Sequence, residues 1–134
     1  MKVFEKDGYD GIGIGIFGDF IVIDIDDCVE DGKLNSLATE IVEKSHSYAE
    51  LSISGKGVHI WLRAPGLVYD RERYYFNNRK YGLEVYPAGV TTKFIVTTSN
   101  AGGDCDVNEC TEALKDILEK VKEAGFLWTQ VLHR

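Results

Sequence analysis

The sequence predicts an α+β fold in which a largely antiparallel sheet carries helices on one face. Short apolar segments rich in Ile, Val and Phe alternate with Gly-containing turns, as in strands that follow one another closely. Two longer segments instead carry apolar residues at helical spacing. The order is strand, strand, helix, strands, loop, strands, helix, and neighbouring strands joined by short turns favour antiparallel pairing.

The first strands lie in residues 10–27, "DGIGIGIFGDFIVIDIDD", which predict two apolar strands around a turn at Gly18-Asp19. This segment also contains Gly13-x-Gly15-x-x-Gly18, the spacing of a dinucleotide-binding fingerprint. That fingerprint requires a helix after the glycines, and here a second strand follows. We therefore expect no dinucleotide site.

The remaining elements follow in order. Residues 32–47 carry an apolar helical stripe, and we expect His46 to end this helix and either to cap it or to be solvated there. Residues 47–66 predict strand, turn and strand, and residues 68–82 predict a loop. Two further strands, in 83–89 and 92–100, are expected to be joined by a Gly-containing turn. A capping box, Asp106-x-x-Glu109, is then expected to open a helix over 107–125 that Gly125 ends.

Composition narrows the class of protein. We expect one domain over residues 1–134, since 134 residues suffice for a hydrophobic core. No apolar run approaches the roughly 20 residues that span a bilayer, so no membrane association is expected. Three cysteines without a disulfide pattern favour the reducing cytoplasm.

The net charge of −7 disfavours nucleic-acid binding by the bulk surface. Such binding would need a local patch, metal ions or further protein parts. The most basic stretch lies within residues 71–80, where arginines and Lys80 alternate with Tyr74, Tyr75 and Phe76. These aromatic residues could stack on a single strand, or they could anchor the loop to the core.

Asp24 and Asp26 are the first candidates for chemistry. Residues two apart in a strand point to the same face, so the two carboxylates would project side by side and repel each other. A shared divalent cation would relieve this repulsion, and hard oxygen ligands suit Mg²⁺ or Mn²⁺. The alternative is that Asp26 and Asp27 are ordinary solvated turn residues.

Two further segments combine polar groups with strand context. The turn from Ser54 to His59, "SGKGVH", offers flexible glycines, a lysine and a histidine, which together could cradle a phosphate; an ordinary hairpin is the alternative. Glu84 interrupts an apolar strand and could be a third metal ligand, or a surface residue on an edge strand.

Taken together, these motifs resemble the catalytic core of the archaeo-eukaryotic primase superfamily. The closest likeness is to the bifunctional DNA primase-polymerases of phages, plasmids and other mobile elements. The acid-x-acid motif is Asp24-Ile25-Asp26, the turn ending in histidine is residues 54–59, and the later acid is Glu84 in "LEVY". The likeness covers roughly Gly8 to Asn100 and implies a catalytic core like the RNA-recognition motif.

The resemblance implies a template-directed nucleotidyltransferase that adds nucleotides to a 3′-hydroxyl by means of two ions of Mg²⁺ or Mn²⁺. It assigns metal binding to Asp24, Asp26 and Glu84, and catalysis to these acids with His59. It assigns nucleotide binding to six residues: Ser54, Gly55, Lys56, Gly57, His59 and Lys93. Asn100 is a further candidate to face the site. The implied partners are nucleoside triphosphates, a single-stranded DNA template with its primer, and a helicase domain or another replication protein.

Members of that superfamily usually carry another segment ahead of the position of Gly8. We therefore expect the chain to be a piece of a larger primase, or a reduced relative that needs a partner and is inactive as an isolated chain. Two other functions stay open. One is a non-catalytic nucleotide- or nucleic-acid-binding module of a replication assembly, and the other is a metal-dependent nuclease that uses the same acids.

Overall fold

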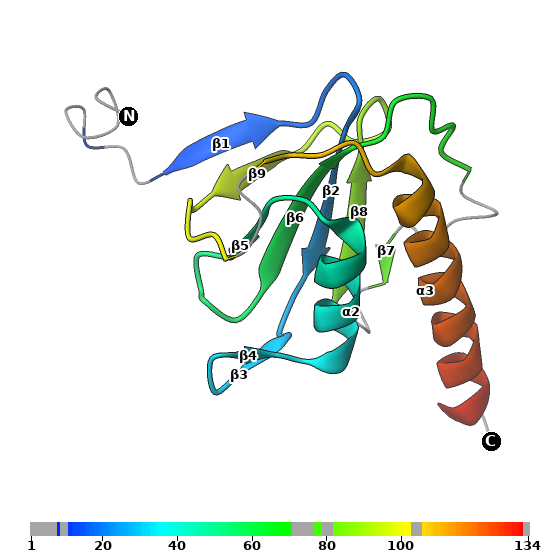
Figure 1. The fold of residues 1–134 in the computed structure, drawn as a ribbon. Coiled ribbons are helices and arrows are strands. Elements are labelled where there is room, and N and C mark those ends of the chain that lie inside the picture. Colours follow the sequence, from blue (N-terminus) through cyan, green and yellow to red (C-terminus); the bar gives the residue numbers. More distant parts are fainter. Residues whose placement is uncertain (1–7, 9–10, 71–76, 79–81, 103–105, 133–134) are drawn as a thin grey trace.

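A five-stranded antiparallel sheet forms the centre of the molecule, and the helices α2 and α3 lie across one of its faces (Figure 1). The structure, a computed structural model, describes residues 8, 11–70, 77–78, 82–102 and 106–132. The sheet has the strand order β5-β6-β2-β8-β7. In that order the strands are Ala49–Leu51, Val58–Arg63, Phe20–Ile25, Leu83–Pro87 and Asn77–Asn78. The predicted α+β class is confirmed.

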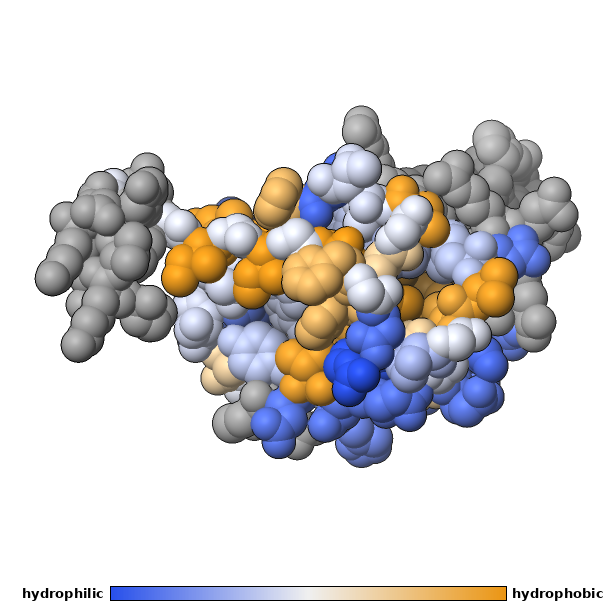
Figure 2. Space-filling view, turned by 90° about the horizontal axis from the view of Figure 1, so that it is seen from above, coloured by the Kyte–Doolittle hydropathy of each residue, from blue (hydrophilic) through white to orange (hydrophobic). Residues whose placement is uncertain are grey.

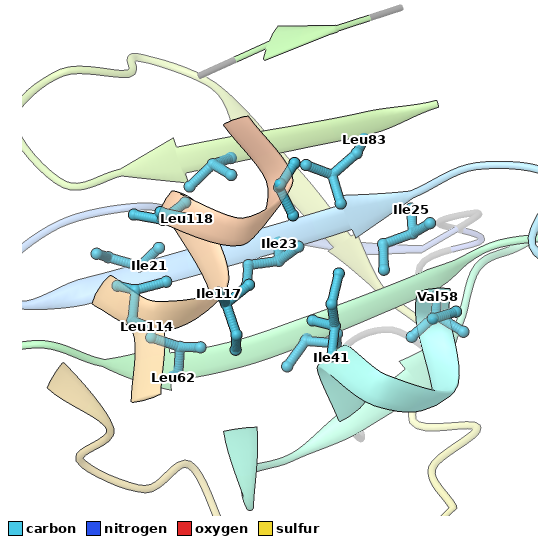
Figure 3. Packing of buried hydrophobic residues seen from close by; sticks show 14 of the residues in the cluster. Ile21, Ile23, Ile25, Ile41, Val58, Leu62, Leu83, Leu114, Ile117 and Leu118 are labelled. Carbon is cyan, nitrogen blue, oxygen red and sulfur yellow. The ribbon is translucent and has the colours of Figure 1, made fainter. Parts of the chain in front are cut away.

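Strand β2 lies in the middle of the sheet, with β6 on one side and β8 on the other. Its alternate residues Ile21, Ile23 and Ile25 are buried against the helices, as period-two alternation requires. Figure 3 shows these isoleucines beside side chains of α2 (Ser36–Ser45) and α3 (Thr111–Leu132). This cluster is the main hydrophobic core.

The other face of the sheet carries a smaller core. Val22, Trp61 and Tyr86 come from β2, β6 and β8, and they pack with Ile16 and Ile95. Ile95 belongs to β9 (Phe94–Thr97), which pairs with β1 (Ile12–Gly15) in a separate two-stranded ribbon. The ribbon therefore contributes to burying one part of this face, while polar side chains occupy another part.

The partners of β1 and β9 differ from the prediction. Both strands of residues 10–27 are present, but β1 pairs with β9 and not with β2. The strands of 83–89 and 92–100 likewise do not pair with each other. Both edges of β2 are already paired with β6 and β8, so no edge is left for β1. Glycine at 15 also favours the observed pair, because a Cβ there would lie 3.3 Å from the Phe94 ring.

The ribbon exposes apolar surface. Large hydrophobic side chains are exposed on it and on the following turn, at Ile12, Ile14, Phe17 and Phe94. Figure 2, seen from above, shows apolar surface on this side of the molecule, around the part of the view where β1 lies.

The first predicted helix is present as α2, but its predicted range began too early, because residues 33–34 form strand β4. Asn35 caps it, since its Oδ1 accepts a hydrogen bond from the backbone N–H of Ala38 at 2.9 Å. His46 ends it in the left-handed conformation with φ 44°, as expected. A short hairpin, β3 (Val29–Glu30) with β4 (Lys33–Leu34), precedes the helix.

The predicted start and end of the last helix are wrong. Helix α3 begins at Thr111, and the Glu109 carboxylate accepts from the Thr111 backbone N–H at 3.0 Å. Asp106 lies five residues before this start, and its carbonyl accepts from Tyr48 N–H at 2.9 Å, in the segment between α2 and β5. The helix also continues through Gly125 to Leu132, because the glycine keeps a helical backbone. Neither α2 nor α3 is long and apolar enough to cross a membrane.

The predicted loop over 68–82 lies only partly within the described residues. Asn77 and Asn78 form β7 and pair with β8, which the sequence did not predict. The basic and aromatic residues of 71–76 and 79–81 lie outside the described residues.

Candidate functional site

Three of the predicted residues lie in one row across the central sheet. Asp24 of β2 is paired directly with His59 of β6 on one side and with Glu84 of β8 on the other. Directly paired residues of antiparallel strands point to the same face. All three side chains therefore lie on the face opposite the helices, on three adjacent strands, although the chain separates Asp24 and Glu84 by 60 positions.

Asp24 has an unusual environment for a carboxylate. Its Oδ1 is buried and has no hydrogen-bond partner among the described residues; His59 Nε2 lies 3.7 Å from it. Burial raises its pKa to about 6, and the charges of Asp26 and Glu84 act in the same direction, against the opposing effect of His59 and Lys93. The site thus holds the proton of Asp24 more tightly than water does, and a bound cation would favour the ionised form.

Glu84 is half-buried and already has neighbours. The Tyr86 hydroxyl donates a hydrogen bond to its Oε2, and Lys93 Nζ lies 3.9 Å from the same oxygen. The ammonium group of Lys93 also lies 5.1 Å from the centroid of the Tyr86 ring, within cation–π range. The structure therefore brings the predicted nucleotide-binding Lys93 to the predicted metal ligand Glu84.

Asp26 lies just past the end of β2 and is exposed. Its backbone N–H donates to the Gly82 carbonyl at 2.7 Å. Glycines flank it closely: a Cβ on Gly57 would lie 3.5 Å from the Asp26 Cα, and one on Gly82 would lie 2.9 Å from its carbonyl oxygen. Asp26 is thus held near Asp24 by backbone contacts, with its carboxylate left at the surface.

In the predicted phosphate-binding turn, the backbone amides of residues 55–57 already donate hydrogen bonds within the turn. The backbone N–H of Gly55 donates to the Ser52 carbonyl at 2.9 Å, that of Lys56 to Ser54 Oγ at 3.2 Å, and that of Gly57 to Ser52 Oγ at 3.0 Å. The Lys56 carbonyl accepts from two amides just past β2, those of residues 28 and 29. The turn is therefore fixed beside the end of β2, but a phosphate there must displace the serine hydroxyls.

Glu50 is the residue of this region that sequence reasoning missed. It lies on β5 directly opposite His59, so it extends the polar row by one strand. Its side chain is fully buried, and His59 Nδ1 lies 3.5 Å from its Oε1. The imidazole of His59 therefore sits between two carboxylates, Glu50 and Asp24. The only sequence signal was a lone acid between Ala49 and Leu51 in a short strand.

Asn100 lies beside β5, at the Glu50 end of the row. It is exposed, its carbonyl accepts from Leu51 N–H at 3.0 Å, and it lines a cavity of about 260 Å³ beside α2 and β5. A second cavity, of about 220 Å³, lies at the other end of β2, near Asp19. Neither cavity is lined by Asp24, His59 or Glu84.

The acids do not form a closed metal cage. Among the described residues, no group of three or more Asp, Glu, His and Cys side chains is arranged to hold a metal ion. What the row offers is an unpartnered carboxylate oxygen, a second carboxylate, an imidazole and an amine on one sheet face. This set can bind a cation together with an anionic ligand that supplies further oxygens.

Comparison of the chain with models of known protein families gives no match, and comparison with curated proteins gives none either.

Proposed function

We propose that this chain is a primase-polymerase core that adds nucleotides to a 3′-hydroxyl under the direction of a DNA template. The observation that carries the proposal is the buried, unpartnered Oδ1 of Asp24, which lies in register with His59 and Glu84. A buried polar atom without a partner is costly. Ligand binding at this position would recover that cost.

The donor set fits Mg²⁺ or Mn²⁺. Asp24 on β2, Glu84 on the adjacent β8 and Asp26 just past the end of β2 offer hard carboxylate oxygens. Mg²⁺ is usually held by one or two carboxylates together with substrate phosphates, rather than by a cage made of protein alone. An ion at this position would therefore take further oxygens from a bound triphosphate. When bound, two such ions would stabilise the attacking hydroxyl and the leaving pyrophosphate.

The basic groups around the acids fit a triphosphate. His59 Nε2 faces Asp24, and the ammonium group of Lys93 lies beside Glu84, so an imidazole lies on one side of the metal position and a positive charge on the other. Lys56 is exposed on the turn next to the end of β2. Triphosphate oxygens could replace the hydroxyls of Ser52 and Ser54 at the turn amides, which would use the predicted cradle.

Template-directed extension with Mn²⁺ tests the proposal. We expect the wild-type chain to extend a primer, alone or with a native upstream segment or helicase partner, and Asp24→Ala with Asp26→Ala to remove both extension and nucleotide binding. Asp27→Asn is the matched control, because Asp27 is an exposed acid of the same turn and Asn tolerates its φ of 48°. Extension that survives the double substitution would disprove the proposal.

A second candidate is a nucleotide- or nucleic-acid-binding module without polymerase activity, serving a replication assembly of a phage or mobile element. The turn amides of residues 55–57 are already bonded to Ser52 and Ser54, which favours the binding module. A polymerase would have to break and re-form these hydrogen bonds in every catalytic cycle, whereas a binding module would not. Nucleotide binding that depends on Asp24, without extension under any of these conditions, would select it. Strand cleavage without nucleotide would indicate a nuclease instead.

A further inference from the structure

Glu50 is a buried acid that the proposed chemistry does not use. Its side chain has no exposed surface, and the whole residue is 2% exposed. A buried carboxylate is costly unless hydrogen bonds replace its water shell. The contacts of Glu50 should therefore show what the residue is for.

Its two oxygens have different partners. Oε2 accepts from the Tyr48 hydroxyl at 2.9 Å and from the segment 97–99, through the Thr97 hydroxyl at 2.9 Å and the amides of Thr98 at 3.1 Å and Ser99 at 2.9 Å. Oε1 faces the Trp61 indole N–H at 3.2 Å and His59 Nδ1 at 3.5 Å.

These partners identify Glu50 as an ionised acceptor. Hydroxyl, indole and amide groups donate, and an ionised carboxylate only accepts, so the two sides match. Burial raises the pKa of Glu50, but the hydrogen bonds from Thr97, Tyr48 and the 98–99 amides outweigh burial and leave the pKa below its usual value. A charged Glu50 in turn requires a proton on the His59 nitrogen that faces it.

We propose that Glu50 is a positioning residue that holds the Nδ1–H of His59 and thereby presents Nε2 to the ligand position beside Asp24. The inference rests on the proposed function for the use of Nε2, but the orientation of the ring follows from the contacts alone. Through Oε2, Glu50 also bonds the end of β9 and the residues that follow it. The same carboxylate therefore contacts both the His59 imidazole and the β1–β9 ribbon. Carboxylates that orient a histidine in this way are a recurring device in metal and catalytic sites.

The test is ¹⁵N NMR of the His59 ring in the wild-type chain, at a pH at which the ring is neutral. We expect the proton on Nδ1 and none on Nε2. A proton on Nε2 with a bare Nδ1 would overturn the proposal. This measurement needs no activity and no variant, so it decides the orientation even if substitutions at Glu50 prevent folding.

Glu50→Gln then tests the consequence. The amide offers one acceptor and one NH₂ donor, so it cannot satisfy donors on both sides. In protein shown to be folded by circular dichroism, we expect the His59 tautomers to mix and the nucleotide affinity with Mn²⁺ to fall by about 10- to 100-fold. A folded Glu50→Gln protein with an unchanged tautomer and unchanged affinity would contradict the proposal.

Tyr48→Phe and Glu50→Asp complete the set. Tyr48→Phe removes one of the donors to Oε2 and leaves the contacts of Oε1 in place. It should therefore lower the stability of the protein and leave the His59 tautomer as in the wild type. Glu50→Asp keeps an acceptor-only group and should recover part of the nucleotide affinity lost in Glu50→Gln. A wild-type chain with Nδ1 protonated that extends no primer, alone or with the upstream segment or helicase partner, would refute the proposed polymerase and leave the positioning role standing.

Discussion

Asp24 shows how a single side chain can be unfavourable for the fold and still fit a binding role. Its carboxylate is mostly buried, lacks a hydrogen bond on Oδ1, and lies near the like charges of Asp26 and Glu84. Each of these conditions disfavours the ionised form. Such a side chain costs stability whenever it is charged without a cation, which is typical of residues kept for function.

This cost predicts how stability depends on pH. The pKa of Asp24 is raised from 3.8 to about 6 in the folded state, so the native protein holds the proton more tightly than the unfolded chain. The contribution of Asp24 to stability is therefore fully present below about pH 4 and is lost as the pH rises through about 6, a difference of about 3 kcal/mol.

Asp24→Asn removes this titration. We expect the substitution to raise the free energy of unfolding at pH 8 by about 1–3 kcal/mol and to change it little at pH 4. Urea unfolding at the two pH values measures this, with Asp27→Asn as the control for loss of one acidic group nearby. A gain of equal size at both pH values would show that the carboxylate charge is not the cause.

At the scale of elements, local signals predicted which segments form strands and helices, but not which strands pair. The alternation of apolar residues in β2 and the apolar stripe of α2 were sufficient to identify a strand and a helix, because burial of one face produces each pattern. The pairing of β1 with β9 joins segments about 80 residues apart and depends on both edges of β2 being occupied elsewhere. The start of α3 was misplaced because the backbone of Asp106 is bonded to Tyr48, a long-range contact that no local pattern indicates.

The close approach of β8 to the end of β2 predicts a special role for Gly82. Gly66 and Gly82 both have positive φ, at 80° and 64°, but only Gly82 has a close neighbour, the Asp26 carbonyl 2.9 Å from a would-be Cβ. We expect Gly66→Ala to cost about 1 kcal/mol from backbone strain and Gly82→Ala about 2–4 kcal/mol from strain plus the clash. Chemical denaturation compares the two, and equal costs would contradict the role of the contact.

The capping of α2 gives a second prediction at this scale. Asn35→Ala removes the acceptor for the Ala38 amide and should lower the free energy of unfolding by about 1 kcal/mol. Asn35→Ser and Asn35→Asp retain a capping oxygen and should stay close to the wild type. The same denaturation experiment measures all three variants, and a wild-type value for Asn35→Ala would exclude this cap as a stabilising feature.

At the scale of the whole molecule, the helices bury one face of the sheet and leave part of the other for the polar row. Local patterns drew attention to Asp24, His59 and Glu84 with alternatives left open, and only the resemblance to the primase superfamily grouped the three as one site. The sequence could not predict Glu50, whose hydrogen-bond donors include residues 97–99, nearly 50 positions away. Polar groups that are satisfied only through tertiary contacts leave no pattern in the local sequence.

The net charge of −7 and the acids of the row together predict how the molecule responds to ligands. A triphosphate alone should bind weakly, because it is repelled by the acids, and Mn²⁺ alone should bind weakly, because no closed cage among the described residues receives it. Together the metal ion and the triphosphate neutralise each other's charge.

We therefore expect Mn²⁺ with a nucleoside triphosphate to raise the melting temperature of the protein by more than the sum of the separate effects. At a ligand concentration one hundred times the dissociation constant, joint binding would add about 2.7 kcal/mol to the free energy of unfolding. Asp24→Asn should abolish this increment while Asp27→Asn keeps it, and purely additive shifts in the wild-type protein, measured by differential scanning fluorimetry at constant ionic strength, would refute a joint site.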